Sequence, residues 1–166
     1  MSRVRVEPTE EVQSLNLPEW RRPVVCMPLT QAFPQFEQIK EFRSKVCLFN
    51  EARDRVFDVV SDRYQLVEHG RAIDMVQNAM ARYFGKAGAP QFIVRSFNGG
   101  ARIRGEVRLP IPEIKLGERD VSHLTLMLRN SYDRSCTFSA KLGAFRVVCS
   151  NGAVIGDVFG SITARH

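Results

Sequence analysis

The residues best suited to chemistry in this sequence are arginines in a short stretch whose pattern predicts a β-hairpin. The apolar-rich segments 91–97 (QFIVRSF) and 101–109 (ARIRGEVRL) flank Asn98-Gly99-Gly100, and glycine after asparagine is a strong signal for a tight turn. Because side chains alternate between the two faces of a strand, three arginines fall on one face, with Ile103 and Val107 on the other. These arginines are Arg102, Arg104 and Arg108, and Arg95 lies on the preceding strand.

A row of guanidinium groups suits the phosphate backbone of a nucleic-acid strand, and the nearby aromatic side chains of Phe92 and Phe97 suit the stacking of bases. The same pattern is equally expected of a charged outer face over a buried inner face, where arginine is only a solvated surface residue. Gly105 weakens the second strand and is typical of a β-bulge. The hairpin alone leaves both interpretations open.

The distribution of charge points to the same part of the chain. The protein has 166 residues and a formal net charge of +6. Residues 1–89 hold 13 Lys and Arg against 12 Asp and Glu, residues 90–150 hold 10 against 5, and residues 151–166 hold one of each. An excess of +5 on the strand-rich middle segment is the footprint expected of a nucleic-acid-binding sheet. We therefore predict one basic surface made by Arg95, Arg102, Arg104, Arg108, Arg129, Arg134, Lys141 and Arg146.

Arg146 is open to a second interpretation, because it stands inside an apolar run. There it could be a buried partner for an acid such as Asp133.

The common signatures of catalysis are missing from the sequence. It contains no Walker A loop and no G-x-G-x-x-G, H-E-x-x-H or G-x-S-x-G motif. The three histidines lie far apart along the chain, and the carboxylates of the basic half fall mostly in predicted loops. We therefore expect no enzyme activity, no cofactor and no metal site. A metal-dependent nuclease, which would need clustered carboxylates, is the third of three hypotheses.

The cysteines form no C-x-x-C pair and have no histidine at zinc-finger spacing. We expect them to be reduced thiols packed in the core. They are Cys26, Cys47, Cys136 and Cys149.

The elements that must position the arginines are mostly predicted strands. Leu124 opens a segment of alternating apolar and polar residues that turns at 130–135 and again at Asn151-Gly152, a strong hairpin signal. Earlier in the chain, the pattern predicts an antiparallel meander and, between prolines, a short edge strand. The meander covers 43–50, 56–60 and 64–67, and the edge strand covers 24–27.

One helix is predicted over residues 70–85. Ile73, Val76, Met80 and Tyr83 share one face of it, and we expect that face to pack on the sheet. The predicted fold class is α+β, with an antiparallel sheet of about six or more strands and this helix on one face.

The length fits a single domain. We expect residues 1–22 to form a flexible N-terminal arm and residues 23–166 to form one α+β domain. No apolar run approaches the roughly 20 residues of a membrane-spanning helix, and the N-terminus lacks the apolar core of a signal peptide. We therefore expect a cytoplasmic protein without a membrane partner.

Three separated blocks carry a resemblance to a known family. They are residues 61–76 (SDRYQLVEHGRAIDMV), 128–138 (LRNSYDRSCTF) and 145–152 (FRVVCSNG). Together they resemble the phage/plasmid-like family of uncharacterised proteins, over roughly residues 45–158. The predicted arrangement is in turn similar to that of Rad52-type single-strand annealing proteins. That likeness is at the level of fold, and it implies single-stranded DNA held in a basic groove of an oligomeric ring.

The favoured hypothesis is non-catalytic binding of single-stranded DNA, extending to strand annealing in phage or plasmid recombination by a homo-oligomer. Annealing needs neutralised phosphates and exposed base edges but no catalytic side chain. The alternative is a protein–protein interaction module of a phage or mobile element. An exposed apolar patch would favour the alternative, and converging carboxylates would favour the nuclease.

Overall fold

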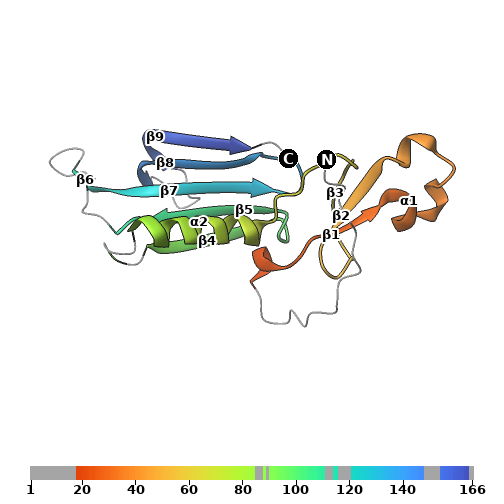
Figure 1. The fold of residues 1–166 in the computed structure, drawn as a ribbon, viewed down its shortest axis with the longest axis horizontal. Helices are drawn as coiled ribbons and strands as arrows, with labels where there is room; N and C mark the ends of the chain where they lie inside the picture. Colours follow the sequence, from red (N-terminus) through yellow and green to blue (C-terminus); the bar gives the residue numbers. More distant parts are fainter. Residues whose placement is uncertain are drawn as a thin grey trace.

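The computed structural model of the protein describes residues 18–84, 88, 90–110, 114–115, 121–147 and 154–164. Two antiparallel sheets lie side by side along the long axis of the molecule, and helix α2 covers one face of the larger sheet (Figure 1). The strands are β1 (Val25–Pro28), β2 (Lys45–Phe49), β3 (Val56–Ser61), β4 (Gln91–Phe97), β5 (Arg102–Arg108), β6 (Ile114–Lys115), β7 (Val121–Ser131), β8 (Phe138–Val147) and β9 (Val154–Ala164). The helices are α1 (Leu29–Ala32) and α2 (His69–Phe84), with 3-10 turns η1 (Glu19–Arg21), η2 (Pro34–Phe36) and η3 (Lys40–Phe42). The predicted α+β class, with an antiparallel sheet and one main helix, is confirmed.

The larger sheet has the strand order β4-β5-β7-β8-β9, with the short β6 paired to β7. A tight turn joins β4 to β5 as predicted, with positive φ angles of 53° at Asn98, 58° at Gly99 and 83° at Gly100. Glycine reaches such angles without the strain that a side chain would bring. The second predicted turn, Asn151-Gly152, lies outside the described residues, although β8 and β9 on either side of it do pair.

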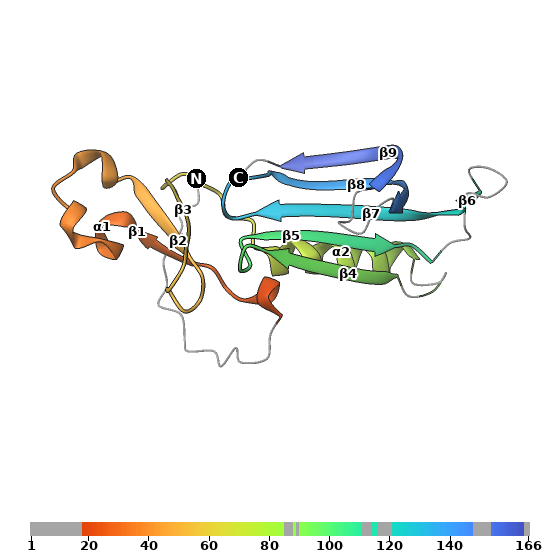
Figure 2. The same ribbon diagram turned by 180° about the vertical axis from the view of Figure 1, so that it is seen from behind.

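Helix α2 lies against one face of the larger sheet (Figure 2). The apolar side chains of the helix pack on that face. Ile73 is fully buried there, and Val76 and Met80 pack beside it, as their spacing predicts. The prediction was wrong for Tyr83, which is 76% exposed, while Phe84 packs against the core. At 3.6 residues per turn, position 84 lies about 20° around the axis from position 73, whereas position 83 lies about 80° away. The sheet residues in the same core are Ile103, Val107, Leu109 and Leu128.

The smaller sheet has the order β1-β2-β3 and a separate apolar cluster around Leu29, Cys47 and Phe49. The predicted strand over 64–67 is wrong, because these residues run from β3 to α2 without pairing in a sheet. The carbonyl of Val67 instead accepts a hydrogen bond from a side chain of β7, which local sequence could not indicate. The predicted edge strand is confirmed as β1, which lies at one edge of this sheet and pairs with β2.

The N-terminal arm predicted over residues 1–22 falls mostly outside the described residues. Within the described part, Glu19–Arg21 forms the 3-10 turn η1, and Trp20 packs against the larger core. The Arg21 guanidinium Nη2 donates to Asp74 Oδ1 of α2 at 2.7 Å. Residues 18–22 are therefore docked on the helix side of the larger sheet.

Three of the four cysteines lie in the part of the chain that the structure describes, and all three are free thiols, as predicted. Cys47 is fully buried, and Cys26 and Cys136 are half-buried. Burial raises the pKa of Cys47 and of Cys26, and the nearby Glu68 carboxylate raises that of Cys26 further. A raised thiol pKa reduces the thiolate fraction that nucleophilic chemistry needs.

Candidate nucleic-acid interface

The face of the larger sheet that α2 does not cover, here called the open face, carries the arginines of β5. Ile103 and Val107 point toward α2 and are 3% and 0% exposed. The residues that alternate with them are exposed or half-buried and lie on the open face: Arg102, Arg104, Glu106 and Arg108. The predicted shared face of the three arginines is confirmed.

Gly105 in the middle of β5 does not mark the expected bulge, because the pairing of β5 with both neighbours runs without a register shift. Its place faces α2. A Cβ built on Gly105 would lie 3.2 Å from Leu128 Cβ and 3.3 Å from Ile73 Cδ1. Glycine is therefore favoured here by the close approach of the helix to the sheet.

Strand register aligns three arginines across the open face. Arg95 of β4 pairs with Arg104 of β5, and Arg104 pairs in turn with Arg129 of β7. We call these three residues the arginine row. Cβ atoms of residues paired in this way lie about 4.5–5.5 Å apart, and like charges placed directly opposite each other destabilise a sheet. Within the described residues, neither Arg95 nor Arg129 forms an ion pair, and both are exposed.

The pKa of Arg104, the central residue of the arginine row, is affected by its neighbours. Burial lowers the pKa of the Arg104 guanidinium, and the positive charges of Arg129 and Arg95 lower it further, while Glu106 acts in the opposite direction. These shifts mean that the protonated guanidinium of Arg104 is held in an unfavourable surrounding. A bound anion would offset the repulsion within the row.

The other two arginines of β5 are paired with acids. The distance from Arg102 Nε to Asp133 Oδ2 is 2.7 Å, and that from Arg108 Nε to Glu106 Oε1 is 3.0 Å. Burial acts to raise the pKa of Asp133, but hydrogen bonds from Ser135 and Arg102 lower it overall, so its carboxylate is well stabilised. On the open face, the arginines for which the described residues supply no acidic partner are therefore Arg95 of β4 and Arg129 of β7.

Two further residues extend the accessible part of the open face beside the arginine row. Lys141 of β8 is exposed and pairs with Met127, one pleat along from Arg129 on the same face. Phe97, at the end of the edge strand β4, is 48% exposed and pairs with Arg102. Thr125 of β7 is on this face too but is only 2% exposed.

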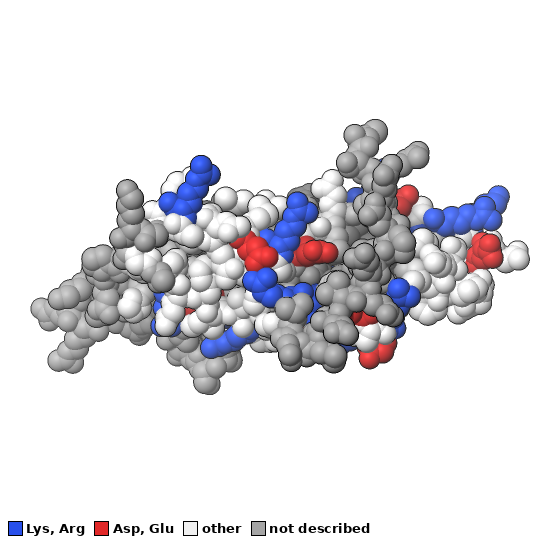
Figure 3. Space-filling model, turned by 60° about the horizontal axis from the view of Figure 1, so that its bottom comes forward, with Lys and Arg blue, Asp and Glu red and all other residues white. Residues whose placement is uncertain are grey.

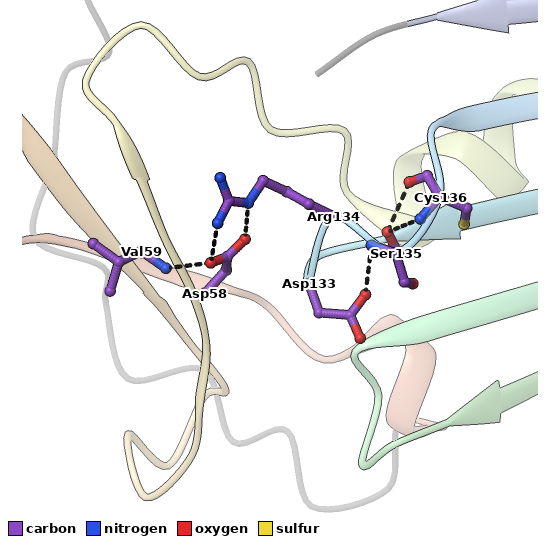
Figure 4. A network of polar contacts seen from close by, with 7 residues as sticks. Asp58, Val59, Asp133, Arg134, Ser135 and Cys136 are labelled. Carbon is purple, nitrogen blue, oxygen red and sulfur yellow. Dashed lines mark hydrogen bonds and ion pairs between the residues drawn. The ribbon is translucent and has the colours of Figure 1, made fainter.

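The remaining two predicted residues are not placed with the arginine row. Arg134, in the turn between β7 and β8, points toward the smaller sheet and binds Asp58 of β3 through two contacts, one of them from Nη2 to Oδ1 at 2.9 Å (Figure 4). That hydrogen bond raises the pKa of Arg134. Arg146 lies in β8, and its side chain falls outside the described residues.

The opposite side of the molecule has mixed charge. Seen from the lower edge of the molecule, basic and acidic side chains lie next to one another (Figure 3). On the helix side of the larger sheet, an ion pair joins Arg21 to Asp74 of α2. The described residues of that side therefore give no row of cations like the one on the open face.

A second polar cluster, here called the junction, lies where the two sheets meet, and its central residue is His69. This histidine is 0% exposed. Its Nε2 lies 3.1 Å from the carbonyl oxygen of Gly100, and its Nδ1 lies 2.9 Å from Asn130 Nδ2. A carbonyl only accepts, so Nε2 carries the proton and Nδ1 accepts from the Asn130 amide.

Aromatic rings complete the junction. The His69 ring stacks on Tyr132 at 3.7 Å between centroids, and the backbone N–H of His69 donates to the Tyr132 hydroxyl at 2.7 Å. Phe57 of β3 contacts the same tyrosine, with centroids 5.5 Å apart. Burial raises the pKa of Tyr132, although the hydrogen bond from His69 opposes this rise. The junction thus joins β3, the start of α2 and the end of β7.

Sequence reasoning missed the junction as a site, but a signal for it was present. Two of the blocks that carry the family resemblance, residues 61–76 and 128–138, supply His69, Asn130 and Tyr132. Because both blocks carry the resemblance to the same family, they could have indicated that these residues lie close together in the fold.

The described residues of the two polar clusters do not form a set that could hold a metal ion. Among the described residues, no set of three or more His, Cys, Asp and Glu side chains lies close enough to hold a metal ion.

In the same residues, no helix has both the length and the apolar character needed to cross a membrane.

Comparison with known proteins identifies a family. Residues 56–166 match DUF932, a domain of unknown function. The matched region runs from β3 to the end of the chain and includes α2, the arginine row and the junction. No curated protein and no solved structure matches the chain. The chain therefore belongs to the DUF932 family of uncharacterised domains.

Proposed function

We propose that the open face of the larger sheet binds single-stranded nucleic acid without catalysis. The observation that carries this proposal is the alignment of Arg95, Arg104 and Arg129 on three adjacent strands. Such an alignment costs stability in the free protein, and a polyanion would turn the repulsion into attraction. The row extends over two strand spacings, about 10 Å, which suits successive phosphates better than one small anion.

The surroundings of the arginine row favour a single strand over a duplex. Phe97 presents an exposed ring at the edge of the row, and bases of an unpaired strand stack readily on such rings. Lys141 adds a fourth cation on the far side of Arg129. Backbone contacts of this kind carry no sequence information, so the binding is expected to have little sequence preference.

We extend the proposal to strand annealing by a homo-oligomer in phage or plasmid recombination, in the cytoplasm. The support comes from the sequence: three blocks resemble phage/plasmid-like proteins, and the arrangement predicted from the sequence is similar to that of Rad52-type annealing proteins. Annealing requires a surface that holds one strand by its phosphates until a complement arrives, and the open face offers such a surface.

The salt dependence of binding tests the proposal. With a labelled single-stranded oligonucleotide, fluorescence anisotropy should show log K falling against log salt with a slope of roughly −3, from four cations at about −0.7 each. The double variant Arg95→Gln/Arg129→Gln should weaken binding and reduce the slope by about 1.4.

A matched control removes the same charge from the other side of the sheet. Arg71→Gln/Arg82→Gln changes two exposed arginines of α2 and should leave the slope nearly unchanged. Equal effects of the two double variants would show a response to net charge alone. Absence of binding by the unaltered protein at low salt would remove the proposal.

A further inference from the structure

The two edges of the larger sheet are built differently. The edge strand β4 carries a charge, Arg95, and η1 lies against it, with Ser96 Oγ donating to Glu19 at 2.5 Å. The edge strand β9 pairs with β8 on one side, and no strand of the described residues pairs with its other side. It has 11 residues with one charged side chain, Asp157, and no proline. Charge, proline and covering segments are what usually keep edge strands from pairing with other chains.

The β9 edge, which pairs with no further strand of the described residues, is also apolar. Exposed fractions are 50% for Val158, 59% for Phe159 and 69% for Ile162. Ile162 pairs with Ala140, which packs toward the core on the α2 side of the sheet. Helix α2 lies over β4 and β5 in both ribbon views, so it does not reach this end of the sheet (Figures 1 and 2).

The register between β9 and β8 shows which part of β9 has the regular geometry needed to pair with a further strand. Pairing with β8 shifts between Leu142 and Gly143, which leaves Phe159 as an extra residue in β9. From Gly160 to Ala164 the ladder is regular. An antiparallel partner is therefore expected along this regular part, with Ile162 at its centre.

We propose that β9 pairs antiparallel with β9 of a second copy of this chain, through Gly160–Ala164, with Ile162 beside the two-fold axis. In this register Ile162 lies opposite its own counterpart, Ser161 lies opposite Thr163, and Gly160 lies opposite Ala164. No like charges meet, because the regular part has none. A self-complementary edge of this kind gives a closed two-fold dimer.

In the proposed dimer, the arginine rows of the two copies lie on the same side of one continuous sheet. A two-fold axis between antiparallel strands of one continuous sheet stands perpendicular to the sheet, so both open faces lie on the same side. Arg129 of one copy and Arg129 of the other are then five strand spacings apart, about 24 Å. The dimer proposal itself does not depend on nucleic-acid binding.

Charge pairing at position 162 tests the proposed register. In sedimentation velocity without nucleic acid, the unaltered protein should dimerise reversibly as its concentration rises. Ile162→Lys alone and Ile162→Glu alone should each weaken dimerisation at least about tenfold, because like charges then lie directly opposite each other. An equal mixture of the two variants should restore the dimer, because opposite charges then meet across the axis.

Met75→Lys is the matched control, since Met75 is 67% exposed on α2, and it should dimerise like the unaltered protein. Recovery in the mixture also shows that the single variants fold. A protein that stays monomeric at all concentrations, a dimer insensitive to position 162, or a mixture that fails to recover would each overturn the proposal. Assembly larger than a dimer that also needs the β4 edge would overturn it in favour of head-to-tail contacts.

Discussion

The arginine row and the junction both bring together polar side chains from distant parts of the chain. They differ in how these side chains are paired: with complementary partners at the junction, and with like charges in the arginine row. At the junction, Arg134 meets Asp58, and the donors and acceptors of His69 meet partners in a buried setting. In the arginine row, three like charges face one another on an accessible surface. The junction therefore adds to the stability of the fold, whereas like charges placed directly opposite each other in the arginine row are expected to lower it.

Removal of the central junction side chain should give the largest effect. His69→Ala leaves the Gly100 carbonyl and the Asn130 amide without their partner and opens a cavity beside Tyr132. We expect the free energy of unfolding to fall by about 3–5 kcal/mol, measured by urea denaturation. The neighbouring exposed change Glu68→Gln should stay within about 0.5 kcal/mol. An unaltered midpoint for His69→Ala would show that the junction does not hold the sheets together.

Phe97→Leu tests the open face with little effect on folding. The change keeps an apolar side chain on β4 but removes the aromatic ring. Stacking of a base on an aromatic ring is worth about 1–3 kcal/mol, so affinity for a single-stranded oligonucleotide should fall by about that amount. The salt slope should not change, because no phosphate contact is lost. A fall in the slope together with affinity would instead place Phe97 among the groups that position the arginines.

The ion pair between the sheets should have a smaller effect. Arg134 is 61% exposed and Asp58 is 15% exposed, so water screens much of their attraction. A double-mutant cycle of Asp58→Asn and Arg134→Gln should give a coupling energy of about 0.5–1 kcal/mol in favour of the pair. Nucleic-acid binding should be the same in all members of the cycle. A loss of binding in the Arg134 variant would place this residue in the interface after all.

The smallest expected effect has the opposite sign. Arg129→Gln removes one charge from the arginine row and should raise the free energy of unfolding by up to about 0.5 kcal/mol at low salt. The gain should shrink in high salt, where repulsion between exposed charges is screened. The control is Arg71→Gln on α2, for which no gain is expected. A destabilised Arg129→Gln protein would contradict the contrast between the two regions.

Local patterns in the sequence were enough for much of the fold. Strand alternation placed Arg102, Arg104 and Arg108 on one face of β5, and the turn at Asn98-Gly99-Gly100 predicted the pairing of β4 with β5. The helical period placed Ile73 against the sheet. Each of these features depends on residues a few positions apart, which a period or a turn signal can capture.

Features that depend on register between distant strands could not be predicted in this way. Arg129 joins the arginine row only because β5 pairs with β7 in a particular register. Arg134 and Asp58 are 76 positions apart, and the hydrogen bond from Asn130 to Val67 spans 63. No pattern within either segment records its partner, so the sequence could indicate which residues are basic but not which would remain unpaired by acids.

The boundary of the DUF932 match has a practical meaning for anyone who wishes to isolate this domain. The match begins at position 56, the first residue of β3, but β3 is the third strand of a sheet whose other members lie before it. A fragment cut at that position would keep the larger sheet but expose the edge of β3, including Val60, which is 3% exposed in the whole chain. The recurring sequence unit and the unit that folds are therefore of different lengths, and a soluble fragment should start upstream of β1.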